Sequence, residues 1–174
     1  MATPHDPLAV WYILAPGCAT PDDSAGEALA QLLTQGHSVL AVPADAPLAQ
    51  QLARETPDLI HVQSLAAAAA LAALPAPGRV PPVIVDCARG QPVAEPLARF
   101  LASEAVDCIL VADAPTRQCL VLDAAIDPGK VRVRPHDPAA IAALYRQIIE
   151  HSAERRRPGS RGTPPSPPQP PSYA

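Results

Sequence analysis

Short runs of apolar residues alternate along this chain with longer stretches of helical periodicity, and no other feature restricts the possible folds as much. The runs are apolar throughout rather than at every second position, which is typical of strands buried on both faces of a parallel sheet. This alternation predicts a doubly wound α/β domain with right-handed crossovers and a mainly parallel, Rossmann-like sheet. The predicted strands are Val10–Ala15, Ser38–Pro43, Asp58–Gln63, Val83–Asp86, Cys108–Ala112 and Lys130–Arg134, and the predicted helices cover about residues 24–35, 46–55, 65–74, 94–105, 115–124 and 138–152.

Residues that commonly end or begin helices lie where this alternation changes. Gly36 follows the first predicted helix, where a left-handed backbone conformation is common. Asp137 and Pro138 provide a cap and a first-turn proline for the last helix. That helix has an apolar stripe on one face, which we expect to pack on the domain. The stripe consists of Ile141, Leu144, Ile148 and Ile149.

The composition changes near the C-terminus and predicts two segments. Residues 8–152 have the apolar content of one folded domain, whereas residues 153–174 are rich in proline and arginine and have no aliphatic side chain larger than alanine. Such a segment cannot bury enough surface to offset its ordering entropy, so we expect a disordered tail. It is either a solvated tail or a docking arm, because it contains P-x-x-P sequences, such as Pro165–Pro168 and Pro168–Pro171, that aromatic grooves recognise.

The charge distribution disfavours a nucleic-acid partner. Residues 1–151 carry nine basic and sixteen acidic side chains, and aromatic residues make up only 3% of the chain. An acidic body does not attract a phosphate backbone. The longest apolar run, Leu65–Leu74, is too short to cross a bilayer. The run Leu8–Ala15 lacks a preceding basic region, so it does not resemble a signal peptide. We therefore expect a cytoplasmic protein without a transmembrane segment.

The four cysteines do not predict a metal site. They occur at positions 18, 87, 108 and 119, without a C-x-x-C pair or a histidine at ligand spacing. A zinc site normally uses closely spaced ligand pairs. Cys108 lies inside an apolar run and is expected to be a small buried side chain. Reduced thiols are the simplest interpretation, although the sequence does not exclude disulfides.

Polar and flexible residues follow the predicted strands. The carboxyl ends of parallel strands meet at one edge of a sheet, and the ligands of open parallel sheets bind outside that edge. The sequence therefore predicts a ligand-binding cleft at this edge. Its candidate residues are Gly17, Ser64, Asp86, Arg89 and Asp113.

Each candidate also has an ordinary structural interpretation. The Arg89 guanidinium suits a phosphate or carboxylate ligand, but a loop arginine is commonly just solvated. Asp86 and Asp113 are either a base or hydroxyl acceptor, or caps and turn residues. His61 lies in an apolar strand and is either a buried hydrogen-bonded imidazole or a catalyst. The motifs G-x-G-x-x-G, G-x-x-x-x-G-K-[ST] and G-x-S-x-G do not occur, so the sequence predicts no cofactor, no metal and no assigned catalytic residue.

Four segments resemble, in order and spacing, the N-terminal domain of family 4 glycosyltransferases of the GT-B fold. Ala28–Val39 resembles the first helix and G-H-x-V turn of that family, and Thr56–Ser64 resembles its P-D-[VL]-[VI]-H-x-H-S strand. Ser103–Asp113 is similar to the A-D-x-[VI]-[IL]-x-[VS]-S segment. Ile126–Pro135 is similar to G-[VI]-x-x-x-K-[VI]-x-V-[VI]-P. The resemblance covers about residues 9–137.

The resemblance implies the acceptor-side half of such an enzyme, without the C-terminal domain that carries most of the nucleotide-sugar site. Residues 138–150 resemble the terminal helix that returns to pack on the first domain. The implied ligand is a sugar or glycan acceptor, and the implied partner is a second chain that supplies the donor domain. If the chain belongs to an enzyme, the implied activity is nucleotide-sugar-dependent hexosyl transfer. The matching ligand-binding positions are His61, Ser64 and Gly90.

The chain departs from the family pattern at several positions. Thr20–Pro21 replaces a Gly-Gly pair, Gln63 replaces the second histidine, and Asp113 replaces a serine. We therefore expect a domain that is degenerate or inactive alone. One alternative is a non-catalytic interaction protein that uses its proline-rich tail. Another is a flavodoxin-like or receiver-type domain, for which Asp22–Asp23 is only a distant match to the required acidic cluster.

Overall fold

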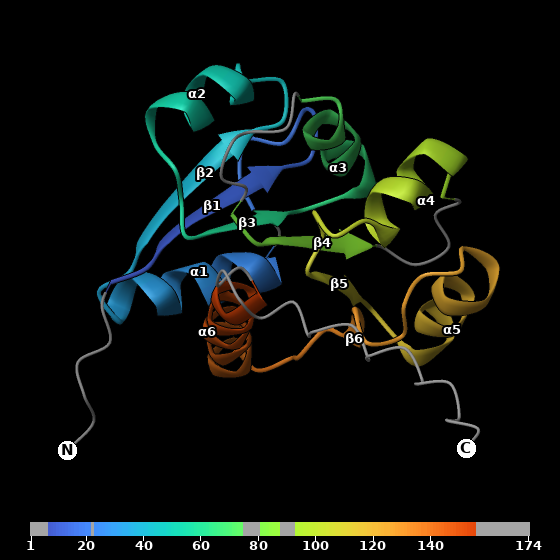
Figure 1. Ribbon diagram of the computed structural model, residues 1–174. Coiled ribbons are helices and arrows are strands. Elements are labelled where there is room, and N and C mark those ends of the chain that lie inside the picture. Colours follow the sequence, from blue (N-terminus) through green and yellow to red (C-terminus); the bar gives the residue numbers. More distant parts are fainter. Residues whose placement is uncertain (1–6, 22, 75–80, 88–92, 156–174) are drawn as a thin grey trace, which may run out of the picture.

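The computed structural model describes residues 7–21, 23–74, 81–87 and 93–155. It contains a six-stranded, all-parallel sheet in the order β2-β1-β3-β4-β5-β6 (Figure 1). This sheet, with helices on both faces, confirms the predicted doubly wound α/β fold class. The strands are β1 (Ala9–Leu14), β2 (Ser38–Pro43), β3 (Leu59–Val62), β4 (Val83–Cys87), β5 (Cys108–Val111) and β6 (Val131–Val133).

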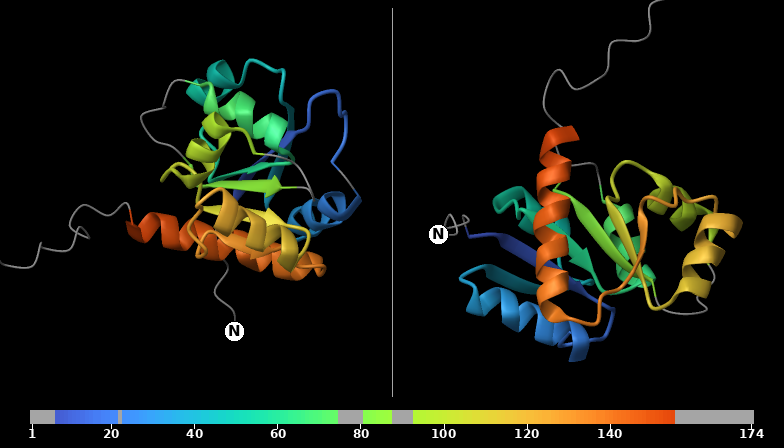
Figure 2. Two further views of the ribbon diagram at one scale, coloured as in Figure 1. Left: turned by 90° about the vertical axis from the view of Figure 1, so that its right-hand side faces the viewer. Right: turned by 90° about the horizontal axis from the view of Figure 1, so that it is seen from below.

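The direction of the crossovers decides which face each helix covers. The chain moves one way along the sheet from β1 to β2, and the other way in every later crossover. Right-handed crossovers in opposite directions place their helices on opposite faces. One face is accordingly covered by α1 (Asp23–Thr34) together with α6 (Pro138–Arg155), which lie side by side (Figure 2). The other face is covered by α2 (Leu48–Arg54), α3 (Leu65–Ala72), α4 (Glu95–Ala102) and α5 (Ala114–Asp123).

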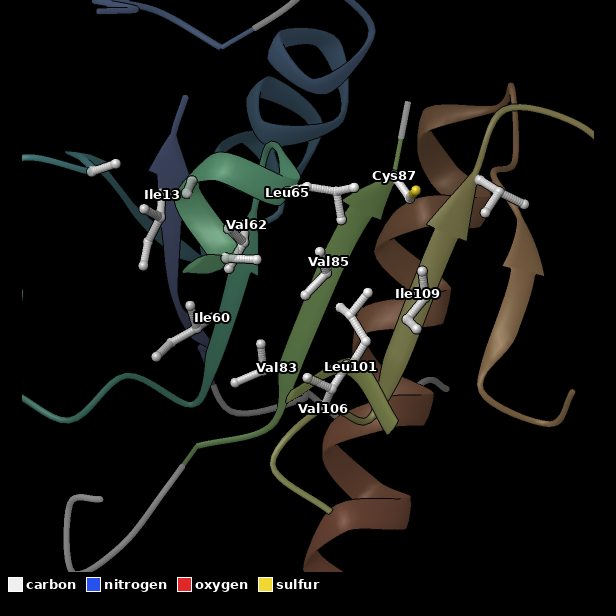
Figure 3. Close-up of a cluster of buried hydrophobic side chains, with 14 of the residues drawn as sticks. Ile13, Ile60, Val62, Leu65, Val83, Val85, Cys87, Leu101, Val106 and Ile109 are labelled. Carbon is white, nitrogen blue, oxygen red and sulfur yellow. The ribbon is translucent and has the colours of Figure 1, made fainter. Parts of the chain in front are cut away.

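Each face of the sheet has its own apolar core. On the α2–α5 face, β-branched side chains such as Val85 and Ile109 pack against α3 and α4 (Figure 3). On the α1–α6 face, Ile84 and Leu110 from the same two strands pack against α6. Successive side chains of a strand point to opposite faces, so strands β1, β3, β4 and β5 must be apolar at almost every position. This explains the continuous apolar runs in the sequence.

The predicted apolar stripe of the last helix is confirmed. Ile141, Leu144 and Ile148 are buried against the sheet, and Ile149 packs at the margin of the same cluster. Burial of each such side chain stabilises the fold by about 1.5–3 kcal/mol. Tyr145 lies on the same buried face of α6, although the predicted stripe did not include it. Thus α6 is an integral layer of the domain.

The ends of the elements agree with the predictions to within a few residues. Gly36 has φ = 83°, as expected for a residue that follows a helix. The Asp137 carboxylate accepts a hydrogen bond from Ala139 N at 3.0 Å and caps α6. Asp58 precedes β3 rather than belonging to it, and its Oδ2 accepts from Ala9 N at 2.8 Å.

The predicted domain and tail are described only in part. Helix α6 extends to Arg155 and therefore includes the first three residues assigned to the tail. Residues 156–174 lie outside the described residues, as do the P-x-x-P sequences. Within the ranges that the structure describes, every helix is too short or too polar to span a bilayer.

The exposure of each of the four free cysteines predicts which thiols react with a reagent. Cys18 and Cys119 are exposed, whereas Cys87 and Cys108 are buried. Burial raises the pKa of the Cys108 thiol to about 12. Burial, and then the neighbouring Asp86, raise the pKa of Cys87. Titration of the native protein with a chromogenic disulfide reagent should therefore show two fast thiols at pH 8, because only thiolates attack.

The same titration in denaturant should show all four thiols. A variant in which both exposed cysteines are replaced by serine is the control, and it should show no fast thiol in the native state. Three or more fast thiols in the native wild type would contradict the burial of Cys87 and Cys108.

Candidate functional site

The strand order reverses between β1 and β3, and this switch point is where open parallel sheets bind ligands. The loop after β1 contains Gly17, whose φ of 78° is a conformation that glycine adopts without strain. The loop after β3 contains Gln63 and Ser64. The two loops are tied together because Ala15 N donates a hydrogen bond to Gln63 Oε1 at 2.9 Å. The structure thus brings Gly17 and Ser64 to neighbouring strand ends.

Two of the predicted site residues act as helix caps. Ser64 Oγ accepts a hydrogen bond from Ala67 N at 3.2 Å at the start of α3. Asp113 Oδ1 accepts from Thr116 N at 2.8 Å at the start of α5. These bonds satisfy backbone donors that a helix leaves without partners in its first turn. Asp113 therefore acts as a helix cap, which was one of the two interpretations that the sequence allowed.

His61 is the centre of a buried polar network on the α1–α6 face. It lies in β3 and is only 1% exposed. Its Nδ1 is hydrogen-bonded to the Tyr145 hydroxyl of α6. Its Nε2 lies 3.2 Å from Asp86 Oδ2. The Tyr12 ring packs edge-on against the imidazole, with ring centroids 4.9 Å apart.

Asp86 connects this buried network to the carboxyl edge of the sheet, where the strands end. Its Oδ2 also lies 3.4 Å from Nη1 of Arg134, the residue that follows β6. The exposed fraction of the side chain rises from His61 through Asp86, at 9%, to Arg134, at 20%. A buried carboxylate is costly unless a positive or hydrogen-bonding group compensates it. Here Arg134 provides the compensating charge.

The partners of His61 favour one arrangement of protons. An ionised carboxylate can only accept, so Asp86 favours a proton on Nε2 of His61. The unprotonated Nδ1 then accepts the hydroxyl proton of Tyr145. Because the ring is buried, with Nδ1 bonded to Tyr145 and Nε2 close to Asp86, the imidazole is placed to hold α6 next to Asp86. It does not itself face solvent.

The structure therefore brings two pairs of the predicted site residues together and leaves Asp113 apart. Gly17 and Ser64 lie in the loops that follow β1 and β3. His61 and Asp86 contact each other on the α1–α6 face of the sheet. Asp113 lies further along, after β5. Arg89 and Gly90 lie outside the described residues.

Sequence analysis missed Tyr145, Arg134 and Tyr12. A signal was present for Tyr145, because it stands between Ile141 and Ile148 in the apolar stripe of α6. A tyrosine in such a stripe needs a partner for its hydroxyl, and a histidine in an apolar strand needs partners too. The pairing of the two residues depends on the position of α6 across the sheet, which no local pattern encodes.

Three hollows are lined by described residues, and they lie away from the carboxyl edge. The first, of about 520 Å³, lies between α6 and the start of β6, where Lys130 and Arg132 are already bonded to Ser103 O and Gln147. The second, of about 540 Å³, lies between α4 and α5. The third, of about 220 Å³, lies at the start of β1 and β2. Within the described ranges, no three histidine, cysteine or acidic side chains are arranged to hold a metal ion.

Comparisons with known proteins provide no family assignment. No protein-family model matches the chain, and neither a curated protein nor a solved structure matches it.

The buried network predicts a difference between two hydroxyl groups on α6. Replacing Tyr145 with phenylalanine leaves a buried imidazole nitrogen without its partner, which should reduce the free energy of unfolding by about 1–3 kcal/mol. Ser152 is the matched control, because its buried Oγ has no hydrogen-bond partner in the described part of the chain. Ser152→Ala should change stability by less than about 0.5 kcal/mol. Urea denaturation followed by circular dichroism measures both, and equal losses would contradict a stabilising Tyr145–His61 bond.

Proposed function

We propose that this chain is the acceptor-side domain of a glycosyltransferase-like enzyme and binds a sugar or glycan at the carboxyl edge of its sheet. The observation that carries the proposal is the switch point between β1 and β3, with Gly17 and Ser64 in its two loops. It is the place in an open parallel sheet where a ligand reaches the backbone groups of two loops at once. The motif resemblance gives that ligand its chemical class.

The four family-like segments are distributed over the same sheet. They supply α1 with β2, then β3, β5 and β6. The histidine of the family's strand motif corresponds to His61, which lies behind the edge and contacts Asp86. In this proposal His61 and Asp86 are positioning residues, whereas Arg134 faces the ligand.

Arg134 has suitable chemistry for a polyhydroxylated ligand. Its guanidinium donates to ring or hydroxyl oxygens. The Arg134 side chain is partly exposed, and its contact with the buried Asp86 carboxylate at 3.4 Å keeps it in place before a ligand arrives. A guanidinium preorganised in this way binds with a smaller entropy loss.

The proposal assigns the nucleotide-sugar site to a separate donor domain. The described residues provide a single sheet and no phosphate-binding motif. Stabilisation of the leaving diphosphate supplies much of the barrier reduction in such transfer reactions. The role of this chain is therefore to hold the acceptor.

Ligand binding should be detectable by NMR on the ¹⁵N-labelled protein. Titration with free hexoses, short glycans and nucleotide sugars should shift the amides of Gly17, Ser64 and Asp86 for at least one sugar. The amides of Thr56 and Gly129, which lie away from the carboxyl ends of the strands, should not shift. A response confined to those two residues would contradict a site at the carboxyl edge.

A charge-removing substitution tests the contribution of Asp86 to the same binding. Asp86→Asn keeps the size of the side chain and removes its charge, so affinity for the sugar should fall about tenfold or more. Asp123→Asn, at the exposed end of α5, is the matched control and should bind as the wild type does.

The isolated chain should not transfer sugar from any common nucleotide donor. The expected result is no labelled product above the hydrolysis background over a range of acceptors, because no group is assigned to stabilise the leaving diphosphate. Robust turnover by the purified chain would show that the donor site had been placed wrongly.

A non-catalytic interaction protein on the same scaffold is the second candidate. The observation that favours it is that Ser64 and Asp113 cap helices and that His61 is buried, so three of the predicted site residues serve the fold. If no sugar or nucleotide shifts any amide at the carboxyl edge, this second candidate replaces the first.

A further inference from the structure

The two edges of the sheet are protected to very different extents. Edge strands expose unpaired backbone groups, and soluble proteins usually guard them with charged side chains or by keeping them short. β6 follows this rule, since it has three residues with Arg132 at its centre. β2 has six residues and no charged side chain, and only its last residue, Pro43, is a protective one.

Apolar side chains are exposed on both faces beside β2. Leu40 in β2 is 45% exposed on the α2 face, and Leu33 at the end of α1 is 55% exposed. Gln35, two residues after Leu33, accepts a hydrogen bond from Arg146 of α6. Two residues correspond to about 200° around a helix, so Leu33 lies on the flank of α1 that faces away from α6. Because α6 lies under the middle of the sheet, this flank is on the side of the free β2 edge (Figure 2).

The β1–β2 ladder determines which backbone groups of β2 point outward. Ser38 N donates to Leu8 O at 2.8 Å, so Ser38 is bonded to β1. In a parallel ladder, alternate residues bond to the same neighbour, which assigns Leu40 and Val42 to the inner side as well. The N–H and C=O groups of Val39 and Ala41 therefore point to the free edge.

We propose that two copies of this chain associate by antiparallel pairing of their β2 strands, which makes one continuous sheet across a two-fold axis. Val39 of each copy lies opposite Ala41 of the other, and the two pairs form about four backbone hydrogen bonds. Leu40 lies on the axis and packs against Leu40 of the second copy. Leu33 of each copy adds apolar contact on the other face.

The neighbouring registers are excluded by residues at the two ends of β2. Shifting the pairing towards the C-terminus places Val39 opposite Pro43, which has no N–H to donate. Shifting it towards the N-terminus places Ala41 opposite His37, which is buried and whose N already donates to Leu32 O. Only the register centred on Leu40 satisfies the outward groups of both copies.

A second copy fits this edge better than a charged partner does. The chain has a net charge of −4, but β2 itself is uncharged, so two β2 strands meet without repulsion between their side chains. In a two-fold contact the same patch of each copy meets its equivalent, so the exposed leucines of both copies become buried together. The proposal is independent of the sugar-binding site, which lies at the strand ends.

Sedimentation of the full chain over a range of concentrations tests the proposal. The wild type should be a reversible dimer with a micromolar dissociation constant. Leu40→Lys places two ammonium groups opposite each other, and Ala41→Pro removes an outward N–H that β1 does not use. Each should raise the dissociation constant at least tenfold while circular dichroism stays unchanged. Val133→Lys, at an exposed position of the other edge strand, is the matched control and should dimerise as the wild type does.

Three outcomes of that experiment overturn the proposal. They are a wild type that is monomeric at every accessible concentration, a dimer that is unaffected by Leu40→Lys, and equal weakening by Val133→Lys. If Ala41→Pro does not fold, Leu40→Lys still decides the question.

Disulfide crosslinking tests the register directly. Directly opposed residues that are not hydrogen-bonded have Cα atoms about 4.5 Å apart, within the range of about 4.4–6.8 Å that a disulfide spans. In a background with Cys18 and Cys119 replaced by serine, Leu40→Cys should give a covalent dimer on mild oxidation. Leu122→Cys, at an exposed site on α5, should remain monomeric. Failure of Leu40→Cys to crosslink would overturn the proposed register.

Discussion

The structure depends on covering both faces of a parallel sheet with apolar side chains. Strands β3, β4 and β5 are buried at every position, so each needs a helical layer above and below. Four crossovers run in the same direction and place their helices on one face, which leaves α1 as the only crossover helix on the other in the described part of the chain. Helix α1 lies beneath the β1–β2 side of the sheet. The middle of that face therefore requires α6, whose buried stripe completes the core.

Polar contacts determine how α6 sits on that face. An apolar stripe can slide along an apolar sheet at modest cost, whereas the Tyr145–His61 bond has one position in which both groups are satisfied. Asp86 and Arg134 extend the same network to the sheet edge. A second polar contact, between Arg146 and both Gln35 and His37, joins α6 to the end of α1. The fold thus combines apolar packing with a few polar contacts that fix the position of α6 on the sheet.

The fold could be predicted from the sequence because its signals are local. Apolar runs, helical periodicity and residues such as Gly36 and Asp137 each act within a few positions, and the structure agrees with them closely. The helix-capping role of Asp113 is local as well, and it was among the structural alternatives. The network around His61 was not predictable, since it joins residues 84 positions apart. Its formation depends on the strand order and on the placement of α6, which are properties of the whole fold.

The position of α6 at the end of the described chain also affects how the protein is made. During synthesis, β1 to β6 can pair before α6 has left the ribosome, but the sheet face that α6 covers then remains bare. His61 has no tyrosine partner from α6 until residue 145 has been synthesised and has docked. Contacts between distant residues form slowly because the intervening loop must close. The nascent chain consequently passes through a stage with an exposed apolar face, at which a chaperone can act and at which self-association competes with completion of the fold.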